Sequence, residues 1–388
     1  MKTLVEVSEL IRQRRLSPVE LLATCLERIE RLQPALNAFI TIAAVSAREA
    51  AQAAEQEIQA GNWKGPLHGI PIGIKDFYDT AGLATTAAFE HFKQRVPAKD
   101  AVAVDKLKQA GAVLIGKTNM HTLGMGTTGL VSYFGAVKNP SNADYIPGGS
   151  SSGSAAAVAS GMCFATLDTD AIGSCRLPAA CCGVVGFKGS YGLIDVTGIL
   201  AGEPPPDDMI RWLGHAGVTT RSSRDTALVL SVLADTSISE ADRALRIGVA
   251  NNAKTDAEVA AVFDRAVAKL RTLGHAVTEA PAPFVDFKKG LAAIEADRQA
   301  IGAHAFADID VLVLPTTVST TPLVKDAEKD PQFLSPALTM FANYYGLPAI
   351  SLPCGVDSHG LPVGFQIVAR PGDDAAVLQL ARQYEQAA

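Results

Sequence analysis

The chain has 388 residues, of which 48% are hydrophobic and 19% are charged. This apolar content is enough to build a large buried core, so the composition excludes a globally disordered protein. The formal net charge of -6 and the lack of any apolar run of about 18 residues lead us to expect neither nucleic acid nor membrane as a partner.

The first 60 residues are predicted to form a helical arm that packs on the main body. Ser17-Pro18-Val19-Glu20 has the pattern of a capping box with proline at the first helical position. Apolar residues then recur at helical spacing, at Leu21, Leu22, Cys25, Ile29 and Leu32. An alanine-rich stretch predicts a second helix over about residues 45–60.

From residue 69 onward, apolar runs of strand length alternate with helical patterns. The predicted strands are residues 69–74, 112–115, 163–167, 246–250, 310–314, 349–353 and 364–368. The predicted helices are residues 100–110, 154–160, 256–273 and 374–386. This order predicts an α/β fold: one large domain over residues 1–388, with a central mixed, mostly parallel sheet covered by helices on both faces.

The six cysteines show no CxxC pair and no spacing typical of a zinc site. We therefore expect no metal ion, and a reducing compartment, which we take to be the cytoplasm.

Two Gly/Ser-rich segments are candidates for chemistry. Residues 147–154 form a Pro-Gly-Gly-Ser-Ser-Ser-Gly-Ser loop that opens into a helix of small residues, and such a loop directs backbone N–H groups toward one point. In the second segment, residues 168–180, Ser174 follows a glycine shortly after a predicted strand. Neighbouring N–H groups on such a turn can form an oxyanion hole.

A serine nucleophile needs a base, and the sequence leaves two candidates open. Lys75 ends a buried apolar strand, where desolvation lowers a lysine pKa and permits a neutral base; pairing with Asp76 or Asp79 is the alternative. His121 is the best placed histidine, although a surface or capping role fits it better. Residues 111–118 also match the phosphate-loop pattern, but the four variable residues read as a strand, so we do not expect a nucleotide.

Together these segments resemble the amidase signature family. The resemblance runs from about residue 5 to the C-terminus and is dense over residues 69–192, which we take as the signature core. The motifs that carry it, in chain order, are residues 73–76, 116–120, 148–154, 173–180, 346–353 and 360–366.

The resemblance implies an amidohydrolase with a Ser–cis-Ser–Lys triad and no cofactor. Ser174 would be the nucleophile, Ser150 the serine that follows a cis peptide bond, and Lys75 the base. The oxyanion would be held by backbone N–H groups of three residues, Ala171, Ile172 and Gly173, while Asp170 and Arg176 would brace the loop.

For substrate binding, the resemblance implies a pocket for a small-molecule amide that is lined by five residues: Gly124, Met125, Gly126, Thr127 and Ser151. It leaves a monomer and a homodimer both open. Two alternatives to a free-standing amidohydrolase also remain: the amidase subunit of a tRNA-dependent amidotransferase, and an inactive protein with the amidase fold.

The sequence departs from the family pattern in three places. Asp168 and Ile172 stand where the family usually has glycine, and Ser152 replaces a glycine of many members. The region over residues 287–306 is very short, whereas most members carry several extra helices there. We expect Ile172 to have negative φ, because a β-branched residue is strongly disfavoured at positive φ.

Overall fold

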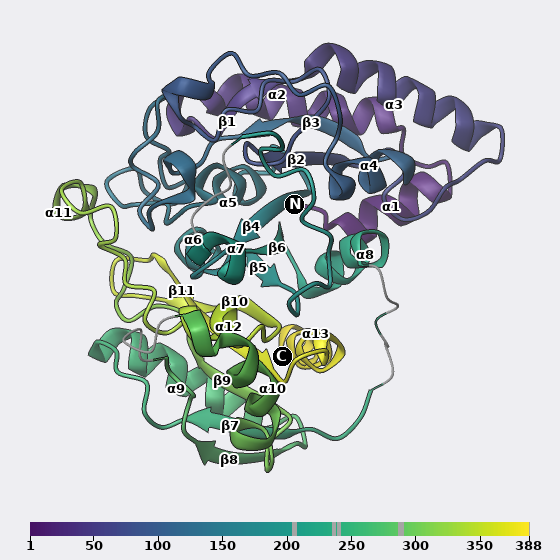
Figure 1. Ribbon diagram of the computed structural model, residues 1–388. Helices are drawn as coiled ribbons and strands as arrows, with labels where there is room; N and C mark the ends of the chain where they lie inside the picture. The colour runs from purple at the N-terminus through teal and green to yellow at the C-terminus, as the bar shows by residue number, and fades with distance from the viewer. Residues whose placement is uncertain (204–207, 235–237, 239–241, 286–290, 388) are drawn as a thin grey trace.

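The computed structural model describes residues 1–203, 208–234, 238, 242–285 and 291–387 of the chain. An 11-stranded sheet runs through it in the order β1-β3-β2-β4-β6-β5-β10-β11-β9-β7-β8. In Figure 1 the sheet extends from the N-terminal helices at the top of the molecule to β7 and β8 at the bottom. Strands from the first and second halves of the chain meet where β5 pairs with β10.

The sheet is mixed, as predicted, but the prediction that it is mostly parallel is wrong. Of the ten strand pairs that the structure describes, six are antiparallel. The strands in chain order are β1 (Phe39–Ile42), β2 (Pro71–Lys75), β3 (Val113–Thr118), β4 (Ala165–Asp170), β5 (Val185–Lys188), β6 (His215–Thr220), β7 (Arg246–Ala250), β8 (Ala276–Ala280), β9 (Val311–Pro315), β10 (Ala349–Val356) and β11 (Pro362–Ala369).

The error has a physical origin in β6 and β10. The sequence of β6, His-Ala-Gly-Val-Thr-Thr, has no apolar run, yet it inserts between β4 and β5 and pairs antiparallel with both. β10 and β11 are joined by a short turn, which permits only an antiparallel pair. Parallel pairing is confined to β2 with β3 and β4, and to β7 with β8 and β9.

The N-terminal arm is helical, as predicted, and also contributes a strand. It contains α1 (Leu4–Arg12), α2 (Pro18–Leu36) and α3 (Ala44–Gln59). Ser17 caps α2 by accepting hydrogen bonds from the N–H groups of Val19 and Glu20. Between α2 and α3, β1 pairs antiparallel with β3 and forms one edge of the sheet.

Helices cover both faces of the sheet, as predicted. Gly364 and Phe365 are successive residues of β11 and so face opposite sides. A Cβ atom at Gly364 would lie 2.8 Å from Ala180 of α6 (Arg176–Cys182). The Phe365 ring lies 6.4 Å from Phe263 of α9 (Ala257–Arg271) and 4.7 Å from Tyr384 of α13 (Asp374–Gln386).

Helix α5 (Ser152–Ala159) brings the Gly/Ser loop to the ends of the central strands. Its residues 152–158 are all buried, and it packs on β2, β3, β4 and β6. Small side chains on this helix permit its close approach to the sheet. The remaining α-helices are α4 (Val102–Gln109), α7 (Asp208–Leu213), α8 (Ser223–Leu233), α10 (Ile294–Ala305), α11 (Val324–Ala327) and α12 (Met340–Tyr344).

Residues 287–290 of the short region predicted over residues 287–306 lie outside the described residues. From there the region holds a 3-10 turn, Leu291–Ala293, followed by α10. Within the described ranges, no helix has the length and hydropathy needed to cross a membrane.

Candidate active site

Lys75 ends β2 and is completely buried. Its Nζ atom lies 2.8 Å from the hydroxyl of Ser150, 2.8 Å from that of Ser151 and 2.9 Å from that of Thr169. Burial lowers the pKa of Lys75 below its ordinary value, while the negative charge of Asp168 opposes that shift. A buried lysine among hydroxyl groups can lose its proton near neutral pH and then accept one from a serine.

Ser150 follows a cis peptide bond with Gly149. The backbone around Gly149 is crowded, because a Cβ atom there would lie 2.9 Å from the N atom of Gly129 and 3.0 Å from the carbonyl oxygen of Gly126. Only glycine fits this position without displacing the neighbouring segment. Gly149 and Ser150 together place the Ser150 hydroxyl beside the amino group of Lys75.

Ser174 lies in the neighbouring segment, and its backbone joins the Gly/Ser loop. The N–H of Ser151 donates to the carbonyl oxygen of Ser174 at 3.1 Å. Ser174 retains 5% exposure, whereas Ser150 and Ser151 retain 1% and 0%, so Ser174 is the most accessible of the three. In the part of the chain that the structure describes, no hydrogen bond links the Ser174 hydroxyl to Ser150 or Lys75.

The backbone between Asp170 and Ser174 forms a tight turn. Ile172 is not among the described non-glycine residues with positive φ, in agreement with the prediction for a β-branched residue. Gly173 has φ of +133°, and a Cβ atom there would lie 2.4 Å from the Thr339 hydroxyl oxygen. This turn therefore requires glycine at position 173 and tolerates isoleucine at 172.

The predicted oxyanion donors differ in their availability. The N–H of Gly173 donates to Asp170 Oδ1 at 2.7 Å, so it is already engaged and the structure does not support it as an oxyanion donor. The N–H groups of Ala171 and Ile172 form no hydrogen bond within the described residues. In that part of the chain, these two amides are therefore not engaged by another group of the protein.

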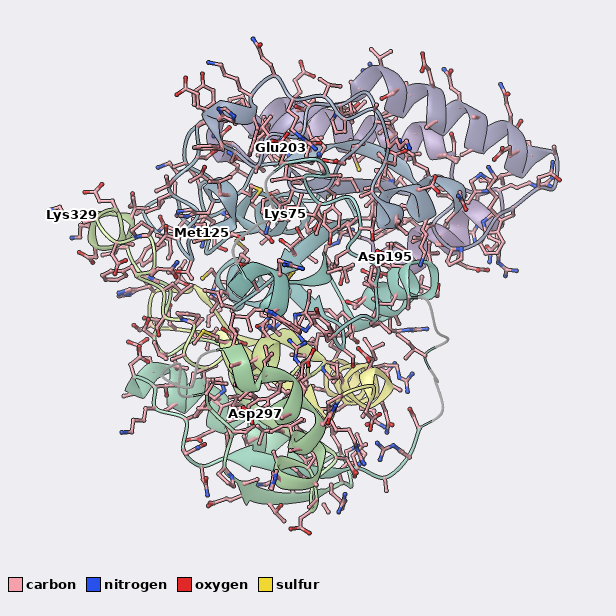
Figure 2. The ribbon with its side chains drawn as sticks, in the orientation of Figure 1. Lys75, Met125, Asp195, Glu203, Asp297 and Lys329 are labelled. Carbon is pink, nitrogen blue, oxygen red and sulfur yellow. The ribbon has the colours of Figure 1, made fainter. Side chains whose placement is uncertain are left out.

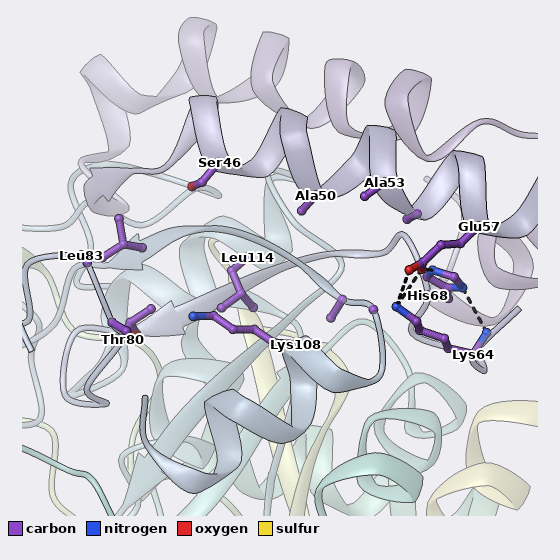
Figure 3. Close-up of a pocket in the computed structure, with 15 residues that line it drawn as sticks. Ser46, Ala50, Ala53, Glu57, Lys64, His68, Thr80, Leu83, Lys108 and Leu114 are labelled. Carbon is purple, nitrogen blue, oxygen red and sulfur yellow. Dashed lines mark hydrogen bonds and ion pairs between the residues drawn. The ribbon is translucent and has the colours of Figure 1, made fainter. Parts of the chain in front are cut away.

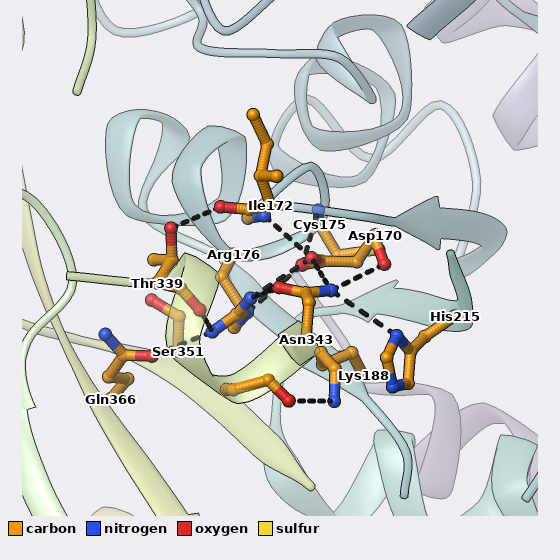
Figure 4. Close-up of polar contacts among 12 residues, drawn as sticks. Asp170, Ile172, Cys175, Arg176, Lys188, His215, Thr339, Asn343, Ser351 and Gln366 are labelled. Carbon is orange, nitrogen blue, oxygen red and sulfur yellow. Dashed lines mark hydrogen bonds and ion pairs between the residues drawn. The ribbon is translucent and has the colours of Figure 1, made fainter. Parts of the chain in front are cut away.

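Asp170 and Arg176 brace this turn from below, as predicted (Figure 4). Both side chains are fully buried, and they form an ion pair at 3.1 Å. Asp170 also accepts from the N–H groups of Gly173 and Cys175, and Arg176 donates to the side chains of Asn343 and Gln366. Burial alone would raise the pKa of Asp170, but the Arg176 guanidinium holds it below its usual range.

Of the five predicted substrate-binding residues, two lie at the site or next to it, and the other three contact other parts of the protein. Gly124 borders the site, since a Cβ atom there would lie 3.7 Å from the Ser150 hydroxyl, and the Met125 side chain beside it is 52% exposed (Figure 2). Gly126 packs against the His121 ring, where a Cβ atom would lie at 2.3 Å. Thr127 is buried and bound to the carbonyl of Pro331.

The structure therefore does not support a substrate contact for Thr127 or for Ser151, whose buried hydroxyl binds Lys75 instead. The sequence did not indicate Thr169, whose hydroxyl is the third hydroxyl partner of the Lys75 amino group after Ser150 and Ser151. Its position near the end of β4 was the available signal, because β2 and β4 are parallel neighbours and Thr169 lies one residue beyond the position level with Lys75.

The structure also places the other two candidates from the sequence, His121 and the phosphate-loop pattern. Burial lowers the pKa of His121 to about 4, and its Nδ1 atom accepts from the N–H of Gly129 at 3.3 Å. Lys117, from the phosphate-loop pattern, lies on β3 and is fully buried, with its Nζ atom bound to the carbonyl of Tyr78 and the hydroxyl of Thr85. The pattern is therefore a strand, as predicted.

A cavity of about 470 Å³ lies elsewhere, between α3 and the segments around β2 and β3 (Figure 3). Alanines of α3 line one side, and Glu57, Lys64 and His68 close one end, with Glu57 2.9 Å from the His68 ring. None of the candidate catalytic residues lines it. Among the described residues, no group of three or more His, Cys, Asp and Glu side chains is arranged to hold a metal ion.

Comparison with known proteins gives a consistent set of similarities. A model of the amidase family matches residues 20–301 and 286–378. One curated relative, a subunit of glutamyl-tRNA(Gln) amidotransferase from Synechococcus sp. (strain CC9605), is 33% identical over 456 aligned positions, which cover 95% of this chain and 93% of the relative. Because that alignment is longer than the 388-residue chain, the relative has residues without a counterpart here.

Two solved structures extend the similarity to the fold. A crystal structure of an amidase superposes with a TM-score of 0.85 at 30% identity and covers 99% of both chains. The structure of 6-aminohexanoate cyclic dimer hydrolase gives a TM-score of 0.85 at 28% identity, covering 99% of this chain and 96% of that one.

Proposed function

Because the chain belongs to the amidase signature family, we propose that it is an amidohydrolase that cleaves a small or medium carboxylic amide through an acyl-enzyme on Ser174. The observation that supports this most strongly is the 2.8 Å contact between Lys75 Nζ and the Ser150 hydroxyl, deep in the fold and beside the Ser174 turn. The three residue types can supply a nucleophile, a relay and a base for amide hydrolysis.

In the proposed reaction, neutral Lys75 accepts a proton from Ser150 while Ser150 accepts one from Ser174. The Ser174 oxygen attacks the amide carbonyl carbon, and the N–H groups of Ala171 and Ile172 stabilise the oxyanion that develops. The C–N bond then breaks, and the relay returns the proton to the leaving amine. Water hydrolyses the resulting ester of Ser174, with Lys75 acting as base for the second time.

The hydroxyl groups around Lys75 support its role as the base. An ammonium group has three protons to donate, and Nζ has three hydroxyl partners at 2.8–2.9 Å: Ser150, Ser151 and Thr169. A hydroxyl can donate as well as accept, so the same contacts persist when Lys75 is neutral. The site thus holds the lysine in place in both protonation states, as a base that works twice per turnover needs.

The direct test is a panel of small aliphatic, aromatic and cyclic amides, with release of ammonia or amine as the readout. We expect saturable turnover of at least one class, with no added metal or organic cofactor. Absence of turnover across the panel, together with a Ser174 that does not react with acylating reagents, would favour the inactive alternative.

A second candidate is the amidase component of an amidotransferase, and the similarity to a subunit of glutamyl-tRNA(Gln) amidotransferase supports it. In that case the chain would release ammonia and pass it to a partner protein. Purification from native cells distinguishes the two, because only the second candidate requires a stably bound partner protein.

Ile172 is expected to restrict the acyl group of the substrate. Its side chain packs with Leu213, Tyr344 and Ile294 beside the turn that holds Ser174. In Ile172→Gly the lost side chain should open space, so that kcat/KM for branched acyl amides rises by about tenfold relative to linear ones, a change typical of one or a few methyl groups in a pocket.

The measurement is the ratio of kcat/KM for the two amide types. Ala171→Gly is the matched control, because it loosens the same backbone turn but removes only one methyl group. An unchanged ratio in Ile172→Gly would show that the isoleucine side chain does not border the acyl group.

A further inference from the structure

Asp168 is a fully buried carboxylate on β4. Its Oδ2 atom accepts hydrogen bonds from the hydroxyls of Thr166 at 2.6 Å and Thr219 at 2.8 Å. By hydrogen-bond geometry its Oδ1 atom has no partner within the described residues, although the Ser154 hydroxyl, which is bound to Thr118, lies near enough to lower the pKa of Asp168. A buried carboxylate with a free oxygen is costly, so its presence calls for a compensating interaction.

The strand register places Asp168 beside Lys75. β2 and β4 are parallel neighbours in which Gly73 pairs with Thr166 and Ile74 with Leu167. One residue further along, Lys75 and Asp168 therefore project from the same face of the sheet. No hydrogen bond or ion pair within 4.0 Å joins them in the described structure, so the carboxylate acts on the lysine through the intervening low-dielectric space.

Other titratable groups packed around Lys75 are offset or held neutral; they are Asp170, Tyr78, His121 and Cys175. Asp170 is paired with Arg176. Burial raises the pKa of the Tyr78 phenol and of the Cys175 thiol. Burial lowers the pKa of the His121 imidazole to about 4. Among the described residues, Asp168 is therefore the acidic group facing Lys75 that has no cationic partner of its own.

We infer that Asp168 is a positioning residue for the base: its carboxylate favours the protonated form of Lys75 and thereby sets the pH above which the Ser–Ser–Lys relay operates. The inference rests on the proposed function. Burial and Asp168 act on Lys75 in opposite directions, since burial lowers the lysine pKa and the carboxylate raises it. Burial also raises the pKa of Asp168 itself, while the charge of Lys75 and the hydroxyls around the carboxyl group oppose that shift and favour the carboxylate. Removing the carboxylate charge should leave burial unopposed and produce the neutral base at lower pH.

The test uses a fluorophosphonate probe, which reports activation of Ser174 without knowledge of the natural substrate. The rate of labelling is measured against pH for the full-length wild type and for Asp168→Asn. Asparagine keeps an oxygen that can accept from the two threonine hydroxyls and removes the charge. We expect the acidic limb of the Asp168→Asn profile to move to lower pH by about one unit, at the low end of shifts produced by a nearby charge.

Asp225→Asn is the matched control. Asp225 is also a buried aspartate with one unpartnered oxygen, but it lies on α8 and accepts from the N–H of Val5. The labelling rate of Asp225→Asn should show the same acidic limb as that of the wild type. If Asp168→Asn does not fold, Thr219→Val removes one donor from the carboxylate, which makes Asp168 easier to protonate, and should move the limb in the same direction by a smaller amount.

The outcomes separate the two claims. Suppose that Ser174 is labelled in the wild type, but the acidic limb of Asp168→Asn stays in place or moves to higher pH. This result overturns the role of Asp168 and leaves the proposed function intact. The same holds for Thr219→Val if that variant replaces Asp168→Asn. A wild type that shows no label on Ser174 at any pH overturns the proposed function and the inference with it.

Discussion

Replacing Lys75 with arginine is expected to reduce kcat/KM at neutral pH by about 10²–10⁴-fold, the range that a positioned general base contributes. Burial lowers the pKa of Lys75. As pH rises through that lowered pKa, the neutral amine appears and activity in the wild type should rise and then level off. Arginine keeps its proton throughout this range, so the variant should lack that rise.

The measurement is the pH profile of kcat/KM, and two further variants control for effects other than proton transfer. Lys75→Met removes the charge as well as the base and should be as inactive as Lys75→Arg. Lys117→Arg places the same larger side chain at another fully buried lysine, on β3, and reports the cost of packing alone. Activity of Lys75→Arg near the wild-type level at neutral pH would show that Lys75 only fills space or pairs with an acid.

Replacing Arg176 with methionine is expected to lower the free energy of unfolding by about 3–5 kcal/mol, as found when one partner of a buried ion pair is removed. The guanidinium is fully buried, and besides Asp170 it donates to the carbonyl of Thr339 at 2.9 Å and to Asn343 Oδ1 at 2.7 Å. Without it, the Asp170 carboxylate would be buried with no cation in contact.

Urea unfolding followed by circular dichroism measures this loss. The matched control is Arg12→Met, which breaks an exposed pair with Glu9 whose side chains are 54% and 45% accessible. Exposed pairs contribute at most about 1 kcal/mol, so the control should unfold almost like the wild type. Equal stability of Arg176→Met and Arg12→Met would contradict the bracing role of the Asp170–Arg176 pair. A double variant with Asp170→Asn should recover part of the loss, because it removes the uncompensated charge.

Much of the fold was predictable wherever hydrophobic pattern and end signals agreed. The strand over residues 246–250 and the last helix, predicted over 374–386, occur at the predicted bounds. Strand direction was not predictable in the same way, because it depends on which strands pair. β6 carries polar threonines that are buried because strands lie on both sides of it and helices α5 and α8 pack on its faces. Periodicity within a segment contains no information about such partners.

The same limit applies to the site. The motifs identified Lys75, Ser150 and Ser174 as residues of interest, since each stands at a Gly-rich turn or at a strand end. They did not reveal that Ser151 and Thr169 bind the lysine, or that the Gly173 amide is engaged by Asp170. Those contacts depend on side-chain directions across three different segments. The resemblance to a family identifies positions, whereas hydrogen-bond partners emerge only from the folded arrangement.

The central claim, that Ser174 is the nucleophile, is tested most directly by the site of covalent labelling with a fluorophosphonate. Trypsin should release residues 139–176 as one peptide, which contains Ser150 and Ser151 as well as Ser174. Fragment ions must therefore assign the adduct to a single serine. We predict that the added mass lies on Ser174, that it is absent in Ser174→Ala, and that Ser231→Ala, a change at an exposed serine of α8, labels like the wild type. An adduct on Ser150 or Ser151, or equal labelling of Ser174→Ala, would contradict the account.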